Sequence, residues 1–168
     1  MTRATLDDIP ALVPLFESYR AFYRCKPDVD AATAFLRERI GKNESIVFFA
    51  RNDPKGPPIG FMQLYPLFSS LLLCRSWLLN DLYVAAEARR GGVAAALIAR
   101  AEELARETGA GLLELSTHQH NRTAQRVYSA AGWSRDDDYY HYSKTIDSFL
   151  PMRSRRKAVA ASTSGLQR

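Results

Sequence analysis

Two arginines followed by two glycines stand where an apolar strand gives way to an alanine-rich run with helical spacing. They are Arg89, Arg90, Gly91 and Gly92, and the run continues from Val93. Small residues let a ligand approach the backbone closely, and the first amides of a helix have no partners inside it. Together with the helix dipole these amides favour an anion, so the segment predicts a phosphate-binding turn. Taken alone, the same residues also fit a surface turn with solvated arginines.

The turn differs from two common phosphate-binding loops. The chain has no Gly-Lys-Ser or Gly-Lys-Thr tripeptide, which excludes a P-loop that hydrolyses nucleotides. It also has no Gly-x-Gly-x-x-Gly sequence after its first strand, which excludes the dinucleotide-binding fingerprint. The expected anion therefore belongs to a ligand of another class.

A second group of residues with the spacing of a site follows the next strand. Asn121 begins a helical stripe that contains Tyr128, and Gly132 and Trp133 follow its end. Considered singly, Asn121 fits a helix cap and Tyr128 fits a core aromatic residue. A phenol with a pKa of about 10 can also donate a proton at neutral pH, which makes Tyr128 a candidate general acid. The joint spacing, downstream of the first motif, favours a functional site.

The two motifs resemble the signatures of GNAT acetyltransferases. These signatures are Arg/Gln-x-x-Gly-x-Gly/Ala after a strand, and Asn-x-x-Ala-x-x-x-Tyr-x-x-x-Gly-Phe/Trp after the next one. The first is matched here by Arg89-x-x-Gly92-x-Ala94, and the second by the residues from Asn121 to Trp133. The resemblance implies a single GNAT-fold domain of the α+β (mixed α/β) class. Its central, mostly antiparallel sheet would have helices on both faces and a splayed central strand pair.

The resemblance also implies acetyl-CoA as co-substrate, and no metal. The amides from Arg90 to Ala95 would hold the pyrophosphate, and the strand Leu82–Val84 would pair with the pantetheine arm, to which Asn121 would also bind. An amide near Leu82 would stabilise the oxyanion on the thioester carbonyl, and Tyr128 would protonate the leaving thiolate. The residues implied to bind the coenzyme are Leu82, Tyr83, Val84, Arg89, Arg90, Gly91, Gly92, Val93, Ala94, Ala95, Asn121 and Tyr128.

Asp81 is the first candidate for the base that deprotonates an amine. An alkyl amine with a pKa of about 10.4 is neutral in only about one molecule in 10³ at pH 7, so its proton must be removed. The segment from Asn80 to Val84 resembles that of polyamine acetyltransferases and of the small polyamine- and histone-directed branch. Asn80 departs from it, because the polyamine enzymes have glutamate there. Asp81 fits a carboxylate that stabilises a turn equally well.

Other polar and aromatic residues are weaker candidates for the functional site. His118 and His120 lack a third ligand for a metal, and His120 fits a reserve base or simple loop structure. The family resemblance makes five residues candidates for an acceptor pocket, although they also fit ordinary helix or strand positions. They are Glu17, Tyr19, Tyr23, Tyr65 and Phe68.

The expected reaction is transfer of an acetyl group to a primary amine, of a small molecule or a lysine-like acceptor, by direct attack in a ternary complex. Neither Cys25 nor Cys74 has a neighbouring base, so a covalent acyl-enzyme has little support. One alternative is a non-catalytic sensor that binds acyl-CoA. Another is a regulator that binds nucleic acid through a basic tail.

The elements that must position these residues follow from periodicity and turn signals. Helices are expected over residues 9–23, 31–40, 92–108 and 121–131, and strands over 45–51, 59–65, 74–84, 112–116 and 139–146. Thr5 and Asp8 resemble a capping box ahead of the first helix. The order of elements predicts one sheet with helices on both faces.

Charge is concentrated at the C-terminus of this chain of 168 residues. Five basic residues and no acid lie within 151–168, which leaves 18 basic and 18 acidic residues elsewhere. We therefore expect a GNAT domain at 1–150 and a disordered basic tail at 151–168, and no nucleic-acid partner. The N-terminus lacks a signal-peptide apolar region and no apolar run could span a membrane, so a cytoplasmic protein without a membrane partner is expected. Homodimers are common in the resembled family.

Overall fold

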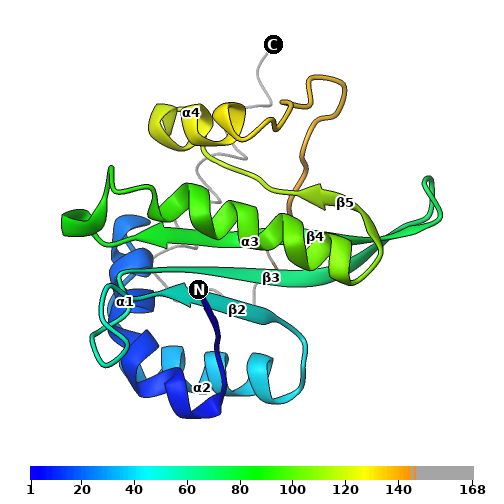
Figure 1. Ribbon diagram of the computed structural model, residues 1–168. Helices are drawn as coiled ribbons and strands as arrows, with labels where there is room; N and C mark the ends of the chain where they lie inside the picture. The colour runs from blue at the N-terminus through cyan, green and yellow to red at the C-terminus, as the bar shows by residue number, and fades with distance from the viewer. Residues whose placement is uncertain (145, 147–168) are drawn as a thin grey trace, which may run out of the picture. The chain divides into compact units, whose positions relative to one another are not determined.

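A computed structural model describes residues 1–144 and 146 of the chain. Met1–Ser134 form one compact unit, and the described residues from Arg135 onward belong to another. Every helix and strand given below lies in the first unit (Figure 1). The tail expected at 151–168, and with it the predicted domain boundary, lies outside the described residues.

The first unit is built on a five-stranded sheet with the order β1-β2-β3-β4-β5. The strands are β1 (Thr2–Arg3), β2 (Ile46–Ala50), β3 (Gly60–Ser69), β4 (Cys74–Val84) and β5 (Ala110–Glu114). The first three pairs are antiparallel, whereas β4 and β5 run parallel. The parallel pair requires a crossover, and the helix that follows β4 supplies it. The mostly antiparallel sheet expected from the sequence is therefore confirmed.

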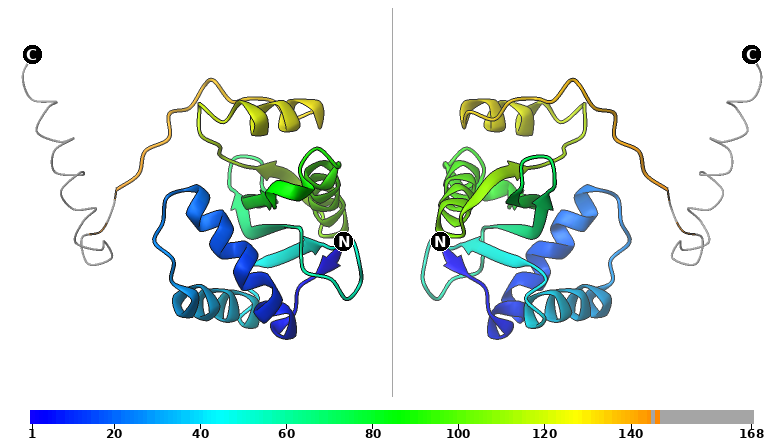
Figure 2. Two further views of the ribbon diagram at one scale, coloured as in Figure 1. Left: turned by 90° about the vertical axis from the view of Figure 1, so that its left-hand side faces the viewer. Right: turned by 90° about the vertical axis from the view of Figure 1, so that its right-hand side faces the viewer.

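Helices cover both faces of this sheet, as Figure 2 shows. On one face α1 (Ile9–Phe22) and α2 (Val29–Gly41) bury an apolar cluster against the sheet. On the other face lie α3 (Val93–Glu107) and α4 (Arg122–Ala130), with a second cluster beneath them. Two short 3₁₀ turns, η1 (Leu6–Asp8) and η2 (Ala86–Ala88), precede α1 and α3. None of the helices in the described part of the chain has the length and apolar character needed to span a membrane.

Helix starts are set by side chains that the sequence makes recognisable. The Thr5 amide and hydroxyl both donate to Asp8 Oδ2 at 3.0 Å, which confirms the capping interaction expected there. Asp28 Oδ1 accepts from the Ala31 amide at 3.0 Å, so α2 begins at Val29, slightly earlier than predicted.

A β-bulge in β4 changes which way its last residues face. Gln63 on β3 pairs with Asp81 and Leu64 pairs with Leu79, so Asn80 has no partner on β3. Strand side chains alternate between faces, and one extra residue inverts that alternation. Leu79 therefore packs on the α3 side, whereas Asp81 faces α1. Without the bulge, Asp81 would lie in the apolar layer beneath α3.

The strand predicted over residues 139–146 is wrong for the residues described there. Residues 139–144 and 146 have no regular secondary structure, and Tyr139, Tyr140 and Tyr142 are exposed. Alternating aromatic residues favour a strand, but a strand forms only where its backbone groups pair with a neighbour. Among residues 1–144 and 146, β5 is an edge strand with β4 as its neighbour.

The first turn of α3 lies very close to β3 because Gly60 has no side chain. A Cβ atom at Gly60 would lie 2.8 Å from Val93 Cγ1 and 3.3 Å from the Tyr83 carbonyl oxygen. Overpacking of this kind costs about 1–3 kcal/mol. We expect Gly60→Ala to lower the free energy of unfolding by that amount in a denaturant titration.

Gly41→Ala is the matched control for this substitution. A Cβ atom at Gly41 would meet Leu6 Cδ2 at an ordinary 3.7 Å, and Gly41 is the last residue of α2. We expect unfolding close to that of the wild type, since alanine favours a helix over glycine. A Gly60→Ala protein as stable as Gly41→Ala would show that α3 does not press on β3.

Candidate functional site

The predicted phosphate-binding turn has a backbone shape that exposes consecutive amides. Arg90 and Gly92 both have left-handed φ values, 64° and 78°. Glycine tolerates this conformation at little cost, whereas arginine does not. Successive N–H groups in such turns form concave sites for anions. Gly92 is also the N-cap of α3, so the turn leads directly into the positive end of that helix.

The amides of residues 90–95 are available to a ligand. Among residues 1–144 and 146, no carbonyl or side chain accepts a hydrogen bond from any of them. The first bond at the start of α3 is donated by the Ala96 amide to the Gly92 carbonyl at 3.0 Å. Unpaired donors at the start of a 15-residue helix form a strong anion site. The residues predicted from the sequence lie in one continuous segment: Arg90, Gly91 and Gly92 form an exposed turn, and Val93, Ala94 and Ala95 form the start of α3, where Val93 and Ala94 are half-buried.

The two arginines of the turn have different surroundings. Arg89 Nε donates to the Val84 carbonyl at 3.1 Å, and its guanidinium lies 5.7 Å from the centre of the Tyr83 ring. Arg89 therefore fastens the turn to the end of β4. Arg90 is exposed beside the unpaired amides. This difference was not foreseen from the sequence, which treats both arginines as phosphate ligands.

Beyond Leu78, β4 has an edge that β5 does not cover. The parallel pairing ends where Leu78 meets Glu114, and β4 continues to Val84 (Figure 1). This is the splayed strand pair expected from the sequence. Leu82 and Val84 face the α3 layer, and Tyr83 faces α1. The uncovered edge ends close to the turn, because a strand and the turn after it are continuous.

Tyr128 lies on α4 and Asn121 is the N-cap residue of that helix, which is on the same side of the sheet as α3. Asn121 Oδ1 caps the helix by accepting from the Ala124 amide at 3.2 Å, which leaves its NH₂ group as a donor. The Tyr128 ring lies 6.0 Å from that of Trp133 and packs against the apolar cluster of α3. Burial, with a smaller effect of Tyr23, raises the pKa of Tyr128 to about 12. The side chain is therefore protonated at neutral pH.

Asp81 is buried and hydrogen-bonded. Its side chain accepts a bond of 2.6 Å from the Tyr19 hydroxyl on α1, and the residue is only 6% exposed. Burial raises the pKa of Asp81, and hydrogen bonds from Tyr19 and Asn80 partly oppose that effect. The Tyr19 contact and the bulge at Asn80 were missed by the sequence interpretation. A tyrosine on the buried stripe of the first helix was the available signal.

Glu17, His118 and His120 were weaker candidates, and their surroundings differ. Glu17 forms an ion pair with Arg20 and accepts from the Asp28 amide at 2.8 Å, so it joins α1 to the start of α2. The His118 and His120 rings are exposed and 5.2 Å apart. In the described ranges, no group of three potential metal ligands gathers.

Other predicted acceptor residues divide between two places. Phe68 is 72% exposed on the β3–β4 hairpin, under Arg75. Tyr23 packs edge-on against Tyr19 at 5.2 Å. Burial, followed by the nearby charge of Asp81, raises the pKa of Tyr65 to about 12. Tyr19 and Tyr65 thus lie near Asp81, and Tyr23 packs on Tyr19.

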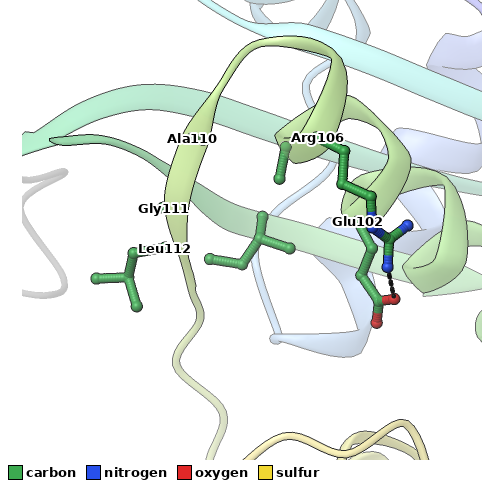
Figure 3. A pocket seen from close by; sticks show the side chains of 7 residues that line it. Glu102, Arg106, Ala110, Gly111 and Leu112 are labelled. Atoms are coloured by element: carbon green, nitrogen blue, oxygen red, sulfur yellow. Dashed lines mark hydrogen bonds and ion pairs between the residues drawn. The ribbon is translucent and has the colours of Figure 1, made fainter.

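A shallow hollow of about 210 Å³ lies elsewhere, between the C-terminal part of α3 and β5. Figure 3 shows its lining, in which Arg106 pairs with Glu102 at 3.3 Å and Leu112 lies nearby. It is at the opposite end of α3 from the turn at residues 89–92. The hollow is therefore separate from the candidate site.

Comparisons with known proteins agree on one family. The family model described as "Acetyltransferase (GNAT) family" matches residues 12–133. A Bacillus subtilis protein described as "Uncharacterized N-acetyltransferase YhfO" is 41% identical over 144 residues, which are 86% of this chain and 95% of that protein. The residues matched by the family model include both candidate motifs.

Two further similarities extend this result. A crystal structure of a probable acetyltransferase has a TM-score of 0.81 and 42% identity, and covers 86% of this chain and 96% of that one. The aminoglycoside N(6′)-acetyltransferase type 1 of Serratia marcescens is 30% identical over 116 residues, or 67% of this chain and 79% of that protein.

Proposed function

Because this chain belongs to the GNAT family of acetyltransferases, we propose that it transfers an acetyl group from acetyl-CoA to a primary amine. The observation that carries the proposal is the run of unpaired amides at residues 90–95, next to the uncovered edge of β4. A diphosphate needs several donors at one place, and an extended pantetheine arm needs a strand edge. Both features fit acetyl-CoA, which supplies an activated acyl group when bound.

Different residues of this chain would bind the coenzyme and assist the reaction. Amides of the turn and the N-terminus of α3 would bind the pyrophosphate, and the Asn121 NH₂ group would donate to the pantetheine arm. An amide of β4 near Leu82 would donate to the thioester oxygen as charge develops there. Tyr128, which keeps its proton at neutral pH, would protonate the departing sulfur.

Direct attack by the amine requires a base, and Asp81 is the candidate. Its carboxylate would take the proton from the ammonium form, directly or through water, before the nitrogen attacks. Neither cysteine is placed as a catalytic nucleophile. Cys25 is exposed and Cys74 is half-buried, and neither has a neighbouring base. We therefore favour a ternary complex over a covalent acyl-enzyme.

The acceptor class is proposed as a small-molecule or lysine-like primary amine. The named activity of the Serratia marcescens relative concerns aminoglycosides, which are small-molecule amines. The likeness of Asn80–Val84 to the polyamine- and histone-directed branch points to other amines of the same chemistry. Cytoplasmic location and a homodimer also remain predictions.

An amine panel tests the proposal. The protein is mixed with acetyl-CoA and, in turn, polyamines, lysine peptides, amino acids and aminoglycosides, and free thiol release is followed. We expect at least one amine to accelerate thiol release and to gain an acetyl group by mass. Binding of acetyl-CoA without turnover of any amine would favour the acyl-CoA sensor.

Asp81→Asn tests the role of the base. Asparagine keeps the size of the side chain and an acceptor for Tyr19 but cannot take a proton. We expect kcat/KM for the amine to fall roughly 100-fold near pH 7, the lower end for general-base catalysis. The loss should shrink as pH rises, because the amine itself loses its proton. Initial rates over a pH series, with unchanged acetyl-CoA affinity as control, provide the measurement, and wild-type rates at pH 7 would exclude Asp81.

A further inference from the structure

The backbone of β4 sets the direction of the Asp81 side chain, and one side chain from α1 forms a hydrogen bond with its carboxylate. The bulge at Asn80 turns Asp81 toward α1, where the Tyr19 hydroxyl donates to Oδ1 at 2.6 Å. The two residues are 62 positions apart in the chain. A bond this short to a buried carboxylate is a strong, charge-assisted one.

Tyr19 is itself fixed by aromatic packing. Its ring lies edge-on to those of Phe61 at 5.7 Å, Tyr83 at 6.2 Å and Tyr23 at 5.2 Å. Burial, followed by the charge of Asp81, raises the pKa of Tyr19 well above its usual value, so the hydroxyl stays protonated. Tyr19 therefore acts as a donor at any physiological pH.

The charges around Asp81 show why this donor matters. No lysine or arginine in the described part of the chain forms an ion pair with Asp81. The titratable groups near it are Tyr19 on α1 and Tyr65 on β3, and both are neutral at pH 7. Burial disfavours the carboxylate, and Tyr19 opposes burial most, followed by the neighbouring Asn80 amide. Glutamate at position 80 would instead place a like charge beside Asp81.

We infer that Tyr19 is a positioning residue for the base: it holds Oδ1 of Asp81, so that the other carboxylate oxygen meets the amine, and its hydrogen bond favours the carboxylate form. The inference rests on the proposed function for its catalytic consequence. Its structural part, the coupling of Tyr19 to the titration of Asp81, stands independently of any substrate.

Titration of Asp81 by NMR tests the coupling without catalysis. Protein labelled with ¹³C in the aspartate carboxyls is titrated, and the Asp81 signal is assigned by its loss in Asp81→Asn. Loss of a hydrogen bond to a charged group weakens the charged form roughly 10- to 100-fold, so Tyr19→Phe should raise the pKa of Asp81 by about one to two pH units. Phenylalanine keeps the aromatic packing, so the fold should persist.

Matched variants separate this coupling from a general disturbance. Tyr23→Phe, one helical turn away, removes a hydroxyl that is not bonded to Asp81 and should leave its titration in place. Asn80→Asp adds a like charge at an exposed position and should raise the pKa of Asp81 as well. An Asp81 titration in Tyr19→Phe that equals the wild type would overturn the inference.

Kinetics then test the catalytic consequence. In Tyr19→Phe the acid limb of kcat/KM for the amine should move to higher pH by the same shift that NMR records, with acetyl-CoA affinity unchanged. A moved NMR titration with an unmoved acid limb would overturn the positioning role. If no amine is acetylated by the wild type, the proposed function fails, and the NMR result still decides whether Tyr19 controls Asp81.

Discussion

Tyr128→Phe is expected to lower kcat by roughly 10²–10⁴-fold while leaving acetyl-CoA affinity within about twofold, because a positioned general acid contributes that much to rate. A proton donated to the departing sulfur stabilises the thiolate of coenzyme A as it forms. Tyr128 holds its proton, since burial raises its pKa to about 12. Phenylalanine keeps the contact with Trp133 and removes only the hydroxyl. Steady-state kinetics and calorimetry on the same protein sample provide the measurement.

The control for this variant is an exposed tyrosine of the second unit. Tyr140 is 88% exposed, and Tyr140→Phe should retain wild-type kcat and affinity. An equal loss of kcat and coenzyme affinity in Tyr128→Phe would argue against an acid role, because it would indicate that the hydroxyl only helps to bind the ground state.

Gly92→Glu is expected to lower acetyl-CoA affinity at least roughly 100-fold, or about 2.7 kcal/mol. The carboxylate would lie next to the amides that are proposed to hold the pyrophosphate, so it would repel the ligand and compete for its donors. In the part of the chain that the structure describes, no atom lies within 4 Å of a Cβ atom at Gly92, so the Cβ atom itself meets no clash. Calorimetric titration of the variant measures the change.

Gly92→Ala separates charge from backbone strain. The φ of 78° at position 92 is unfavourable for any residue with a Cβ atom. Gly92→Glu and Gly92→Ala should therefore both lose about 1–2 kcal/mol of stability. Only the glutamate variant should lose most of its affinity. Equal affinities in Gly92→Glu and wild type would place the phosphate site elsewhere in the chain.

The parts of the site that were predicted from the sequence depend on neighbours along the chain. Unpaired amides are a property of any helix start, so the turn around Gly92 could be predicted before its fold was known. The Asn121 cap follows from local spacing in the same way. The mixed sheet follows from the order of strands and helices, since a parallel pair requires a helical crossover.

The parts that were not predicted depend on contacts between distant segments. Simple alternation places Asp81 on the same face as Leu79, and only the unpaired Asn80 reverses it. The bond from Tyr19 to Asp81 requires α1 to lie across β4, which no local pattern indicates. Arg89 is predicted to bind the coenzyme, and the additional bond from its Nε to the Val84 carbonyl requires the geometry of the turn, which the sequence does not indicate.

Binding of acetyl-CoA to the folded protein is the most direct test of the whole account. Isothermal titration of the full chain with acetyl-CoA should show one site per chain, and affinity should weaken as salt screens the diphosphate. Removal of the phosphates should weaken it too, so acetyl-pantetheine should bind far less tightly. A well-folded protein that takes up neither acetyl-CoA nor a close acyl analogue would contradict the central claim.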